Sequence, residues 1–248
     1  MTNIFLNHLR QKFGPIDIER DSLPALQAHI KPLDAAPAES LEQPINLEEV
    51  ITAIRSGAKH RSPGIDGICH ELYSASWETV HLDLLQLLNQ MLLSKYITPQ
   101  QKQGVLVCIP KTGGHDTPNG YGPISLLNSF YKILAQMLAR QLRQVMAEQL
   151  PHTQFCGVPI NSILDAVSQV RDIIAHAENT GTTLCILTLD FNNAFDRIAH
   201  DYLFYILQTY GNRQDFIDHL RAIYSDATVS LQVNDTLAHP IPIQCGVR

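Results

Sequence analysis

The sequence predicts an α+β fold that is rich in helices and holds a few short buried strands. Several long stretches place apolar side chains every three or four positions, which is the spacing of one helix face. Short continuous apolar runs, such as residues 104–109 and 183–189, are typical of buried strands. The 248 residues are 45% hydrophobic and 17% charged, a globular composition that excludes collagen-like, low-complexity and disordered chains.

The first 45 residues predict a helix followed by a linker. Apolar side chains in residues 2–13 have helical spacing, and Thr2 is a suitable cap. Residues 14–45 hold five prolines and little periodicity. Because proline fixes φ and lacks an amide donor, we expect an extended linker there. We therefore divide the chain into residues 1–45, an N-terminal helix and Pro-rich linker, and residues 46–248, a compact domain.

The compact domain is predicted to begin with a capped helix. Asn46 and Glu49 have the spacing of a capping box, and Gly57 is a typical helix end. The later elements follow from apolar periodicity and from the cap and turn residues between them. They are two helical stretches before Pro99, a strand at 104–109, a long helix from Ser125 to Met146, a helix at 162–178, a strand at 183–189, helices at 200–210 and 213–224, and strands at 227–233 and 239–244.

The cysteines and the chain start predict the cellular setting. The five cysteines are scattered, and no two have CxxC spacing, so neither a disulfide framework nor a zinc ribbon is indicated. Cys69-His70 could contribute to a metal site, although two unconnected side chains are the commoner outcome. The first residues lack the pattern of a signal peptide, and no run of about 18 apolar residues occurs. We expect a reduced, intracellular, soluble protein without a membrane partner, in the cytoplasm or the nucleus.

The charge balance bears on possible partners. Lys and Arg number 18 against 24 Asp and Glu, a formal net charge of −6. A protein that held nucleic acid through phosphate contacts alone would be basic. The composition therefore argues against a simple binder of duplex nucleic acid.

The most informative segment is residues 187–196, which read LTLDFNNAFD. Asp190 follows a predicted buried strand, where a rigid backbone could hold a carboxylate as a Mg²⁺ ligand. Alternatively, Asp190 caps a helix by accepting from the amides of Asn192 and Asn193. From spacing alone the cap is the favoured interpretation, since one carboxylate does not make a two-metal site.

A second candidate is Lys111, which follows an apolar strand and precedes Gly113-Gly114. An ammonium group on such a hairpin could meet a triphosphate, although a solvated turn lysine is the commoner outcome. Residues 62–67, SPGIDG, predict only a loop. No Walker loop, HExxH or GxSxG motif occurs.

Taken in order, these segments resemble the reverse transcriptase domain of LINE-type (non-LTR) retrotransposons. The resemblance covers about residues 45–248. It rests on SPGIDG at 62–67, IPK at 109–111, PISLLN at 123–128 leading into Tyr131-Lys132, Gln154-Phe155, LDFNNAFD at 189–196, and GVR at 246–248. It implies an incomplete right-hand polymerase fold, with the fingers and the first part of the palm. The implied activity is RNA-directed DNA synthesis by two-metal nucleotidyl transfer.

The resemblance also implies roles for four residues. Asp190 matches the first catalytic aspartate of the palm, a ligand to both Mg²⁺ ions, and the carbonyl of Phe191 would help hold one of them. Phe195 matches the aromatic gate that excludes a 2′-hydroxyl, and Lys111 matches a lysine that contacts the incoming triphosphate. The implied partners are an RNA template, a DNA primer and deoxynucleotides.

The chain also departs from the family pattern. Gly122 stands where relatives usually have Arg before Pro-Ile-Ser, and residues 159–161 replace a Gly-Arg pair. The sequence ends at Arg248, before the family's Gln-Gly-Pro motif, paired aspartates and thumb. Asp196 and Asp201 are poor substitutes for a second metal-binding aspartate. We therefore expect a truncated domain that is inactive alone and self-associates through an exposed strand edge.

Two other functions stay open at this point. The chain could be a non-catalytic module, derived from a retroelement, that binds nucleic acid or another partner. It could also be an unrelated Mg²⁺ hydrolase that uses Asp190 and Asp196. That last alternative is the weakest, because a spacing of six does not bring two side chains together on one regular element.

Overall fold

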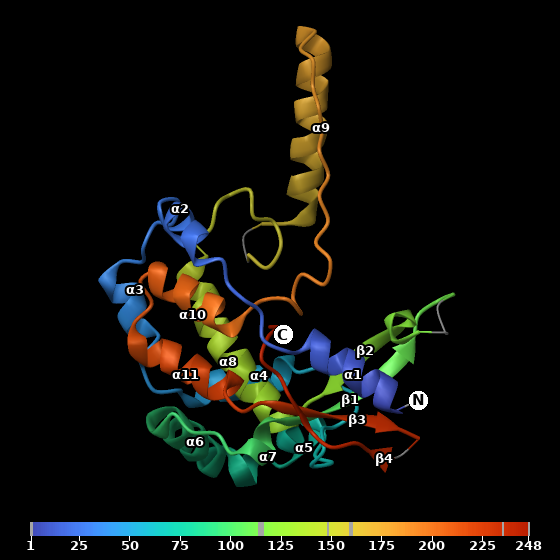
Figure 1. Cartoon of the computed structure of the whole chain (residues 1–248). Helices are drawn as coiled ribbons and strands as arrows, with labels where there is room; N and C mark the ends of the chain where they lie inside the picture. The colour runs from blue at the N-terminus through green and yellow to red at the C-terminus, as the bar shows by residue number, and fades with distance from the viewer. Residues whose placement is uncertain (1, 114–116, 148, 159–160, 235, 248) are drawn as a thin grey trace.

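The computed structural model describes residues 2–113, 117–147, 149–158, 161–234 and 236–247. Figure 1 shows a helical body, a small sheet beside it and an arm that projects away from both. The mixture of helices and strands agrees with the predicted α+β class.

Helices make up most of the fold. Their bounds are Thr2–Lys12 (α1), Leu23–Gln27 (α2), Ala35–Ser40 (α3), Leu47–Ser56 (α4), His70–Ala75 (α5), Trp77–Ser94 (α6), Pro99–Lys102 (α7), Ser129–Met146 (α8), Ile163–Thr180 (α9), His200–Thr209 (α10) and Gln214–Tyr224 (α11). Short 3₁₀ turns cover Arg20–Ser22 (η1) and Pro118–Gly120 (η2).

The predicted caps set several helix starts. Asn46 accepts from the amide of Glu49 at 3.0 Å, and the Glu49 carboxylate accepts from the amide of Asn46 at 2.9 Å. Ser162 and Asp165 form a second capping box at the start of α9. These boxes satisfy amide donors that a helix start leaves without partners.

The helical body packs α4, α6, α8 and α11 around one apolar core. Val50, Leu88, Ile133, Leu134 and Phe216 are fully buried there. Each comes from an apolar stripe that faces the neighbouring helices. The sheet lies beside this body, and the arm projects away from it (Figure 1).

The sheet joins strands that lie far apart in the sequence. Its strands are Gln103–Pro110 (β1), Tyr121–Leu126 (β2), Thr228–Val233 (β3), Thr236–Leu237 (β4) and Ile241–Pro242 (β5). β1 pairs with β2 antiparallel and with β3 parallel, while β4 and β5 pair with β3 antiparallel. This pairing places Gln103, at the start of β1, beside Thr228, which pairs in turn with Pro242 of β5.

The first 45 residues pack against the rest of the fold. Leu9 and Phe13 of α1 are buried against the sheet, in a cluster with Leu106 and Val229. The segment 14–45 contains short helices and buried side chains, among them Leu41 and Ile45, so the expectation of an extended linker is wrong. Apolar side chains between its prolines provide the burial. The domain boundary at residue 45 stays a prediction.

Two further local predictions are wrong. Residues 125 and 126, predicted to start the long helix, belong instead to β2, because they pair with β1. α8 begins at Ser129, and its N-cap residue is Asn128 and not Ser125. Residues 183–189 form no strand, and their side chains are exposed. None of the described strands pairs with them, and an extended segment gains stability only from such a neighbour.

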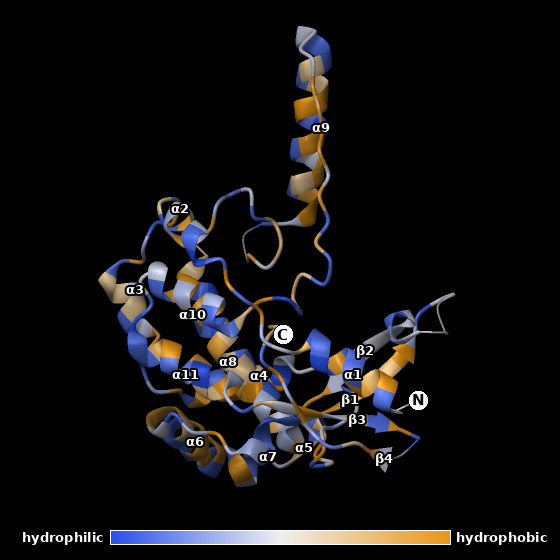
Figure 2. Ribbon diagram, viewed as in Figure 1, coloured by the Kyte–Doolittle hydropathy of each residue, from blue (hydrophilic) through white to orange (hydrophobic). Residues whose placement is uncertain are grey.

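The arm consists of α9 and the extended segment 182–191 that follows it (Figure 1). It exposes many large apolar side chains, as the orange positions of α9 in Figure 2 illustrate. They are Ile163, Leu164, Val167, Val170 and Ile173 on α9, and Leu184, Ile186, Leu187, Leu189 and Phe191 after it. An exposed apolar surface of this extent is typical of an interaction site.

Within the described residues, no helix combines the length and the apolar character needed to cross a membrane.

Candidate functional site

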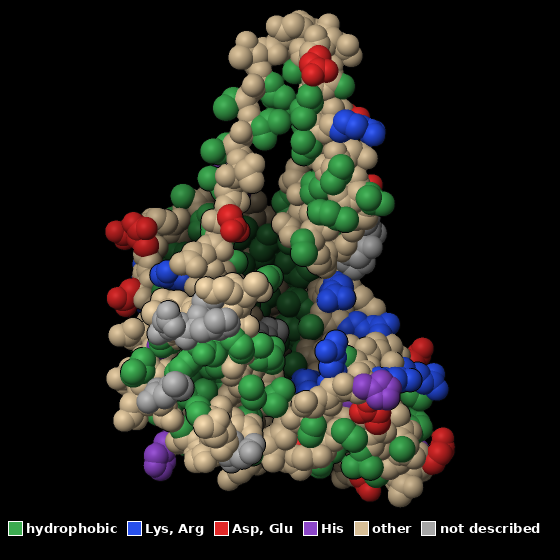
Figure 3. Space-filling model, turned by 90° about the vertical axis from the view of Figure 1, so that its right-hand side faces the viewer, with side chains coloured by type: hydrophobic (Ala, Val, Ile, Leu, Met, Phe, Trp, Pro, Cys, Tyr) green, Lys and Arg blue, Asp and Glu red, His purple; other side chains and the backbone are tan. Residues whose placement is uncertain are grey.

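A polar cavity of about 900 Å³ lies where α1, the β1–β2 hairpin and the turn at residues 192–197 meet. Lys111 lines it from the end of β1, and Asn193, Asp196 and Arg197 line it from the turn. Figure 3 shows Lys and Arg side chains gathered on this side of the molecule, below the arm. The cavity therefore joins two segments that the sequence singled out separately.

The turn at 192–197 has a defined backbone. The amides of Asp196 and Arg197 both donate to the carbonyl of Asn193, at 3.0 and 3.1 Å. Asn193 has a φ of 55°, a left-handed conformation that asparagine tolerates better than most residues. These contacts fix the direction in which the side chain of Asp196 leaves the turn.

An ion pair joins the turn to the N-terminal helix. Lys12 Nζ lies 2.9 Å from Asp196 Oδ2, and the two side chains are only 17% and 21% exposed. The carbonyl of Lys12 also accepts from Cys245 Sγ at 3.3 Å. The pair places a carboxylate and an ammonium group in the cavity wall.

Positive charge surrounds a half-buried histidine in the same wall. The pKa of His8 is lowered, first by burial and then by the nearby charges of Lys12 and Lys111. Both ammonium groups therefore lie close enough to disfavour a third positive charge. Lys111 Nζ donates to the carbonyl of Asn119 at 3.2 Å and is otherwise exposed to the cavity.

The last described residues are tied to the turn. The amides of Gly246 and Val247 donate to the carbonyls of Ile198 and Phe195, at 2.8 and 2.9 Å. Gly246 has a φ of 94°, and a Cβ there would lie 3.3 Å from the carbonyl oxygen of Asp196, so this position needs glycine. The GVR segment, whose Arg248 lies outside the described residues, thus starts beside the LDFNNAFD segment.

The other residues singled out from the sequence lie near the cavity but not in its lining. Asp190 and Phe191 are on the exposed segment that leads into the turn. Phe195 is 69% exposed and lines a separate shallow pocket with Val247. Residues 159 and 160, and Gly114 after Lys111, lie outside the described residues.

The helix-cap interpretation of Asp190 is wrong. In the described residues 192–197 the chain forms turns and no helix, so Asp190 has no helix start to cap. Its carboxylate is exposed to solvent. It therefore has the accessibility that a ligand-binding role requires.

The described residues do not make a complete metal centre. The carboxylate of Asp190 and the carbonyl of Phe191 are oxygen donors of the kind that Mg²⁺ prefers. Across the described part of the chain, however, no group of three or more His, Cys, Asp and Glu side chains comes together as a metal site. Asp196 is paired with Lys12 instead. A two-metal reaction needs more ligands than these residues supply.

The alternative metal site at Cys69-His70 is also not formed. His70 is buried, and its Nε2 lies 2.7 Å from the carbonyl of Ile54, with which it shares a hydrogen bond. A Cβ at Gly57 would collide with the same ring. His70 is thus a core residue that fills the space beside α4.

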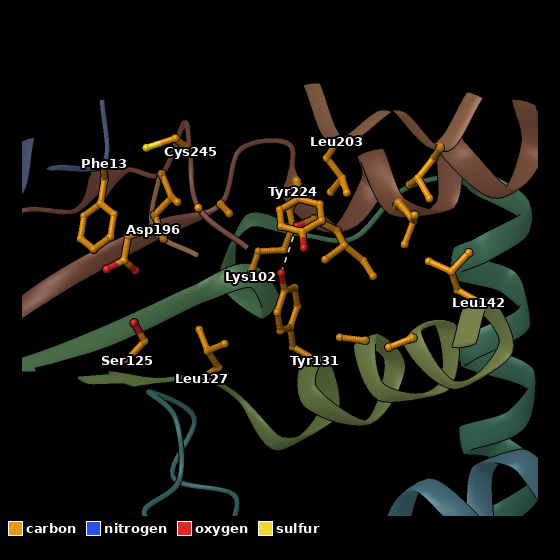
Figure 4. Close-up of a pocket in the computed structure, with 18 residues that line it drawn as sticks. Phe13, Lys102, Ser125, Leu127, Tyr131, Leu142, Asp196, Leu203, Tyr224 and Cys245 are labelled. Carbon is orange, nitrogen blue, oxygen red and sulfur yellow. Dashed lines mark hydrogen bonds between the residues drawn. The ribbon is translucent and has the colours of Figure 1, made fainter. Parts of the chain in front are cut away.

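A second cavity, of about 210 Å³, is apolar and lies between α8, α10 and α11 (Figure 4). In this cavity the Tyr131 hydroxyl donates to the carbonyl of Ile223 at 3.3 Å. Burial raises the pKa of that hydroxyl. Lys102 Nζ donates to the carbonyls of Ala222 and Ser225 at the end of α11. These contacts are typical of structural support for a helix end.

Sequence reasoning missed the contribution of α1 to the polar cavity. His8 and Lys12 are four residues apart, so they lie on one helix face. That spacing was the available signal, but nothing local indicated that this face would meet the β1–β2 hairpin.

Comparisons with known proteins identify related sequences. A family model described as reverse transcriptase (RNA-dependent DNA polymerase) matches residues 109–248. The transposon TX1 uncharacterized 149 kDa protein of Xenopus laevis is 32% identical over 236 residues, which cover 95% of this chain and 18% of that protein.

Two other relatives come from insects. The probable RNA-directed DNA polymerase from transposon BS of Drosophila melanogaster is 30% identical over 205 residues, covering 81% of this chain and 22% of that protein. The retrovirus-related Pol polyprotein from type-1 retrotransposable element R1 of Bradysia coprophila is 30% identical over 166 residues, covering 65% of this chain and 16% of that protein. The chain thus spans about a fifth of the length of these curated relatives. The resemblance predicted from the motifs is confirmed.

Proposed function

The chain belongs to the reverse transcriptase family, as a domain of the non-LTR retrotransposon type, and we propose that its polar cavity binds the deoxynucleoside triphosphate of an RNA-directed DNA polymerase. One observation carries the proposal: Lys111 and the turn of the LDFNNAFD segment line the same cavity. A volume of about 900 Å³ is in the range of cavities that hold small-molecule ligands.

Each candidate residue has a role in this proposal. Lys111 binds the triphosphate through its ammonium group. Phe195 lines a shallow pocket that shares Asn193 and Asp196 with the cavity, and from there it lies under the sugar and selects against a 2′-hydroxyl. Asp190 and the carbonyl of Phe191 are Mg²⁺ ligands, in a family that generally uses this ion. The right-hand polymerase fold that the family implies makes the β1–β2 hairpin part of the fingers and residues 187–196 part of the palm.

The proposed partners are an RNA template and a DNA primer, and the proposed setting is inside the cell, in the cytoplasm or the nucleus. The formal charge of −6 does not oppose this. Lys12, Lys111 and Arg197 concentrate positive charge at the cavity, where a triphosphate needs it.

We also propose that these 248 residues alone do not extend a primer. The support is that, among the described residues, no three or more His, Cys, Asp or Glu side chains come together to hold a metal ion. The assay is primer extension on an RNA template with Mg²⁺ and deoxynucleotides. Incorporation by the wild-type chain that disappears in Asp190→Ala would refute the inactivity.

Nucleotide binding is tested by titration calorimetry with a deoxynucleoside triphosphate at low salt. Lys111→Gln should weaken binding about three- to tenfold, which is the effect of losing one partly solvated charge contact. Lys59→Gln is the matched control, because it removes the same charge from an exposed position outside the cavity. Equal affinity of both variants would refute the role of Lys111.

A second candidate function is favoured by the arm. Its exposed apolar side chains support an interaction module that associates with a second copy of this chain through the extended segment 183–190. Two such segments can pair antiparallel about a two-fold axis, which satisfies their backbone groups and buries the leucines of both. A non-catalytic role in nucleic-acid binding is tested separately, by the salt dependence of binding to a primer–template.

A further inference from the structure

The N-terminal helix forms one wall of the polar cavity, although it lies outside residues 109–248, over which the family model matches. His8 and Lys12 line the cavity from α1, and Lys111 lines it from the β1–β2 hairpin. Building on the proposed nucleotide site, we infer that Lys12 binds the phosphate groups of the nucleotide together with Lys111.

The position of α1 is fixed by contacts of three kinds. Leu9 and Phe13 are buried in the sheet core, and Phe5 meets Tyr121 of β2 edge to face, with ring centroids 5.1 Å apart. The carbonyl of Phe13 accepts from the amide of Gln244 at 2.9 Å. A helix held in this way presents Lys12 to the cavity in a defined place, so the cation does not have to be ordered when a ligand binds.

The charges in the cavity wall favour a polyanion. Lys12, Lys111 and Arg197 are cationic, and the carboxylates of Asp17 and Asp196 oppose them. Two of the cations, Lys12 and Lys111, are close enough to act on the same histidine. Three cations against two carboxylates leave the wall net positive in a protein of formal charge −6, and cations from different elements can contact several phosphate oxygens at once.

Lys12 is paired before any ligand arrives. Its ammonium group lies 2.9 Å from the Asp196 carboxylate, and both side chains are mostly buried. A triphosphate would take over part of this contact, so Lys12 exchanges one anionic partner for another. Asp196 thereby opposes phosphate binding, while Lys12 promotes it.

The β2 strand contributes no cation to the cavity wall. Gly122 lies in β2 opposite Ile109, between Tyr121 and Pro123, which both line the cavity. A Cβ at Gly122 would lie 3.8 Å from its nearest neighbour, the carbonyl of Ile109, so space does not require glycine here. Because successive side chains of a strand point to opposite faces, Gly122 faces away from the cavity, and its partner Ile109 does not line the cavity either. Position 122 is therefore no source of a cation for this wall, whereas α1 supplies Lys12.

The test separates phosphate binding from a purely structural ion pair. Lys12→Gln and Asp196→Asn both break the same pair, but only the first removes the cation. Calorimetric titration with inorganic tripolyphosphate and with a deoxynucleoside triphosphate should show about three- to tenfold weaker binding for Lys12→Gln and at least about twofold tighter binding for Asp196→Asn. Thermal unfolding of both variants checks that α1 stays docked.

Arg10→Gln is the matched control on the same helix, since Arg10 is exposed, donates to Asn7 of α1 and does not line the cavity. It should leave affinity unchanged. If Lys111→Gln weakens binding and Lys12→Gln does not, or if Lys12→Gln and Asp196→Asn change affinity in the same direction, the inference fails and the proposed nucleotide site survives. If the wild-type chain binds neither ligand, the proposed function fails and the inference with it.

Discussion

The arm is predicted to hold two copies of the chain together, and replacing Leu187 and Leu189 by lysine should separate them. These leucines are 77% and 75% exposed, so about three quarters of each side chain is available for burial. Fully burying a leucine contributes about 1.5–3 kcal/mol, which leaves about 1–2 kcal/mol for each of these.

A symmetric dimer buries both leucines of both chains, which gives an upper limit of about 4–8 kcal/mol. Half of the lower value is about 2 kcal/mol of dimerisation free energy. Repulsion between lysines that face each other across the two strands adds about 0.5 kcal/mol for each of two pairs, so the variant loses about 3 kcal/mol. The dimer dissociation constant of the double variant should therefore rise at least about 100-fold.

Sedimentation velocity over a range of protein concentrations measures this constant. The control is Leu82→Lys with Leu93→Lys, because these leucines of α6 are 62% and 78% exposed and lie away from the arm. The control pair should associate as the wild type does. A wild-type chain that stays monomeric at high concentration, or a double arm variant that still dimerises, refutes the reasoning.

Two further predictions concern stability. The pKa of His219 is lowered, chiefly by burial, so the unfolded chain takes up a proton at a higher pH than the folded chain does. The contribution of neutral His219 to stability is therefore fully present above about pH 6.5, and it is lost as pH falls toward the pKa of His219 in the folded chain. The groups that face this ring are Lys95, Asp215, Asp218 and Glu42. Urea unfolding at pH 7.5 and 5.0 should show a smaller loss for His219→Leu than for the exposed control His29→Leu, and equal losses would contradict the assignment. Asn46→Ala removes one half of the α4 capping box and should cost about 1 kcal/mol of unfolding free energy, whereas a loss below about 0.3 kcal/mol would argue that the box adds nothing.

The sequence predicted those elements whose causes are local. The helices α4 and α9 begin at predicted capping boxes, because side-chain and backbone groups three residues apart suffice to make them. The strand β1 was found from its apolar run and the proline that ends it. In contrast, the prediction of Ser125 as a helix cap is wrong, since Ser125 lies in a strand that is defined by its pairing with β1 and not by a local pattern.

The site was predictable only in part, for the same reason. Lys111 and Asp190 were found through motifs that lie within short segments. The contribution of Lys12 depends on how Leu9 and Phe13 pack on a sheet built from residues more than 90 positions later. Residues 183–189 were predicted to form a strand and do not, since apolar composition alone does not supply a neighbouring strand.

The location of the bound nucleotide is the most direct test of the central claim. A deoxynucleoside triphosphate that carries a photoreactive group on its γ-phosphate can be cross-linked to the wild-type chain, and the labelled peptides identified by mass spectrometry. We predict labelling of the peptide that contains Lys111 and of the turn at 192–197, with protection by excess unlabelled nucleotide. Protectable labelling confined to other segments, such as the apolar cavity between α8 and α11, would contradict the claim.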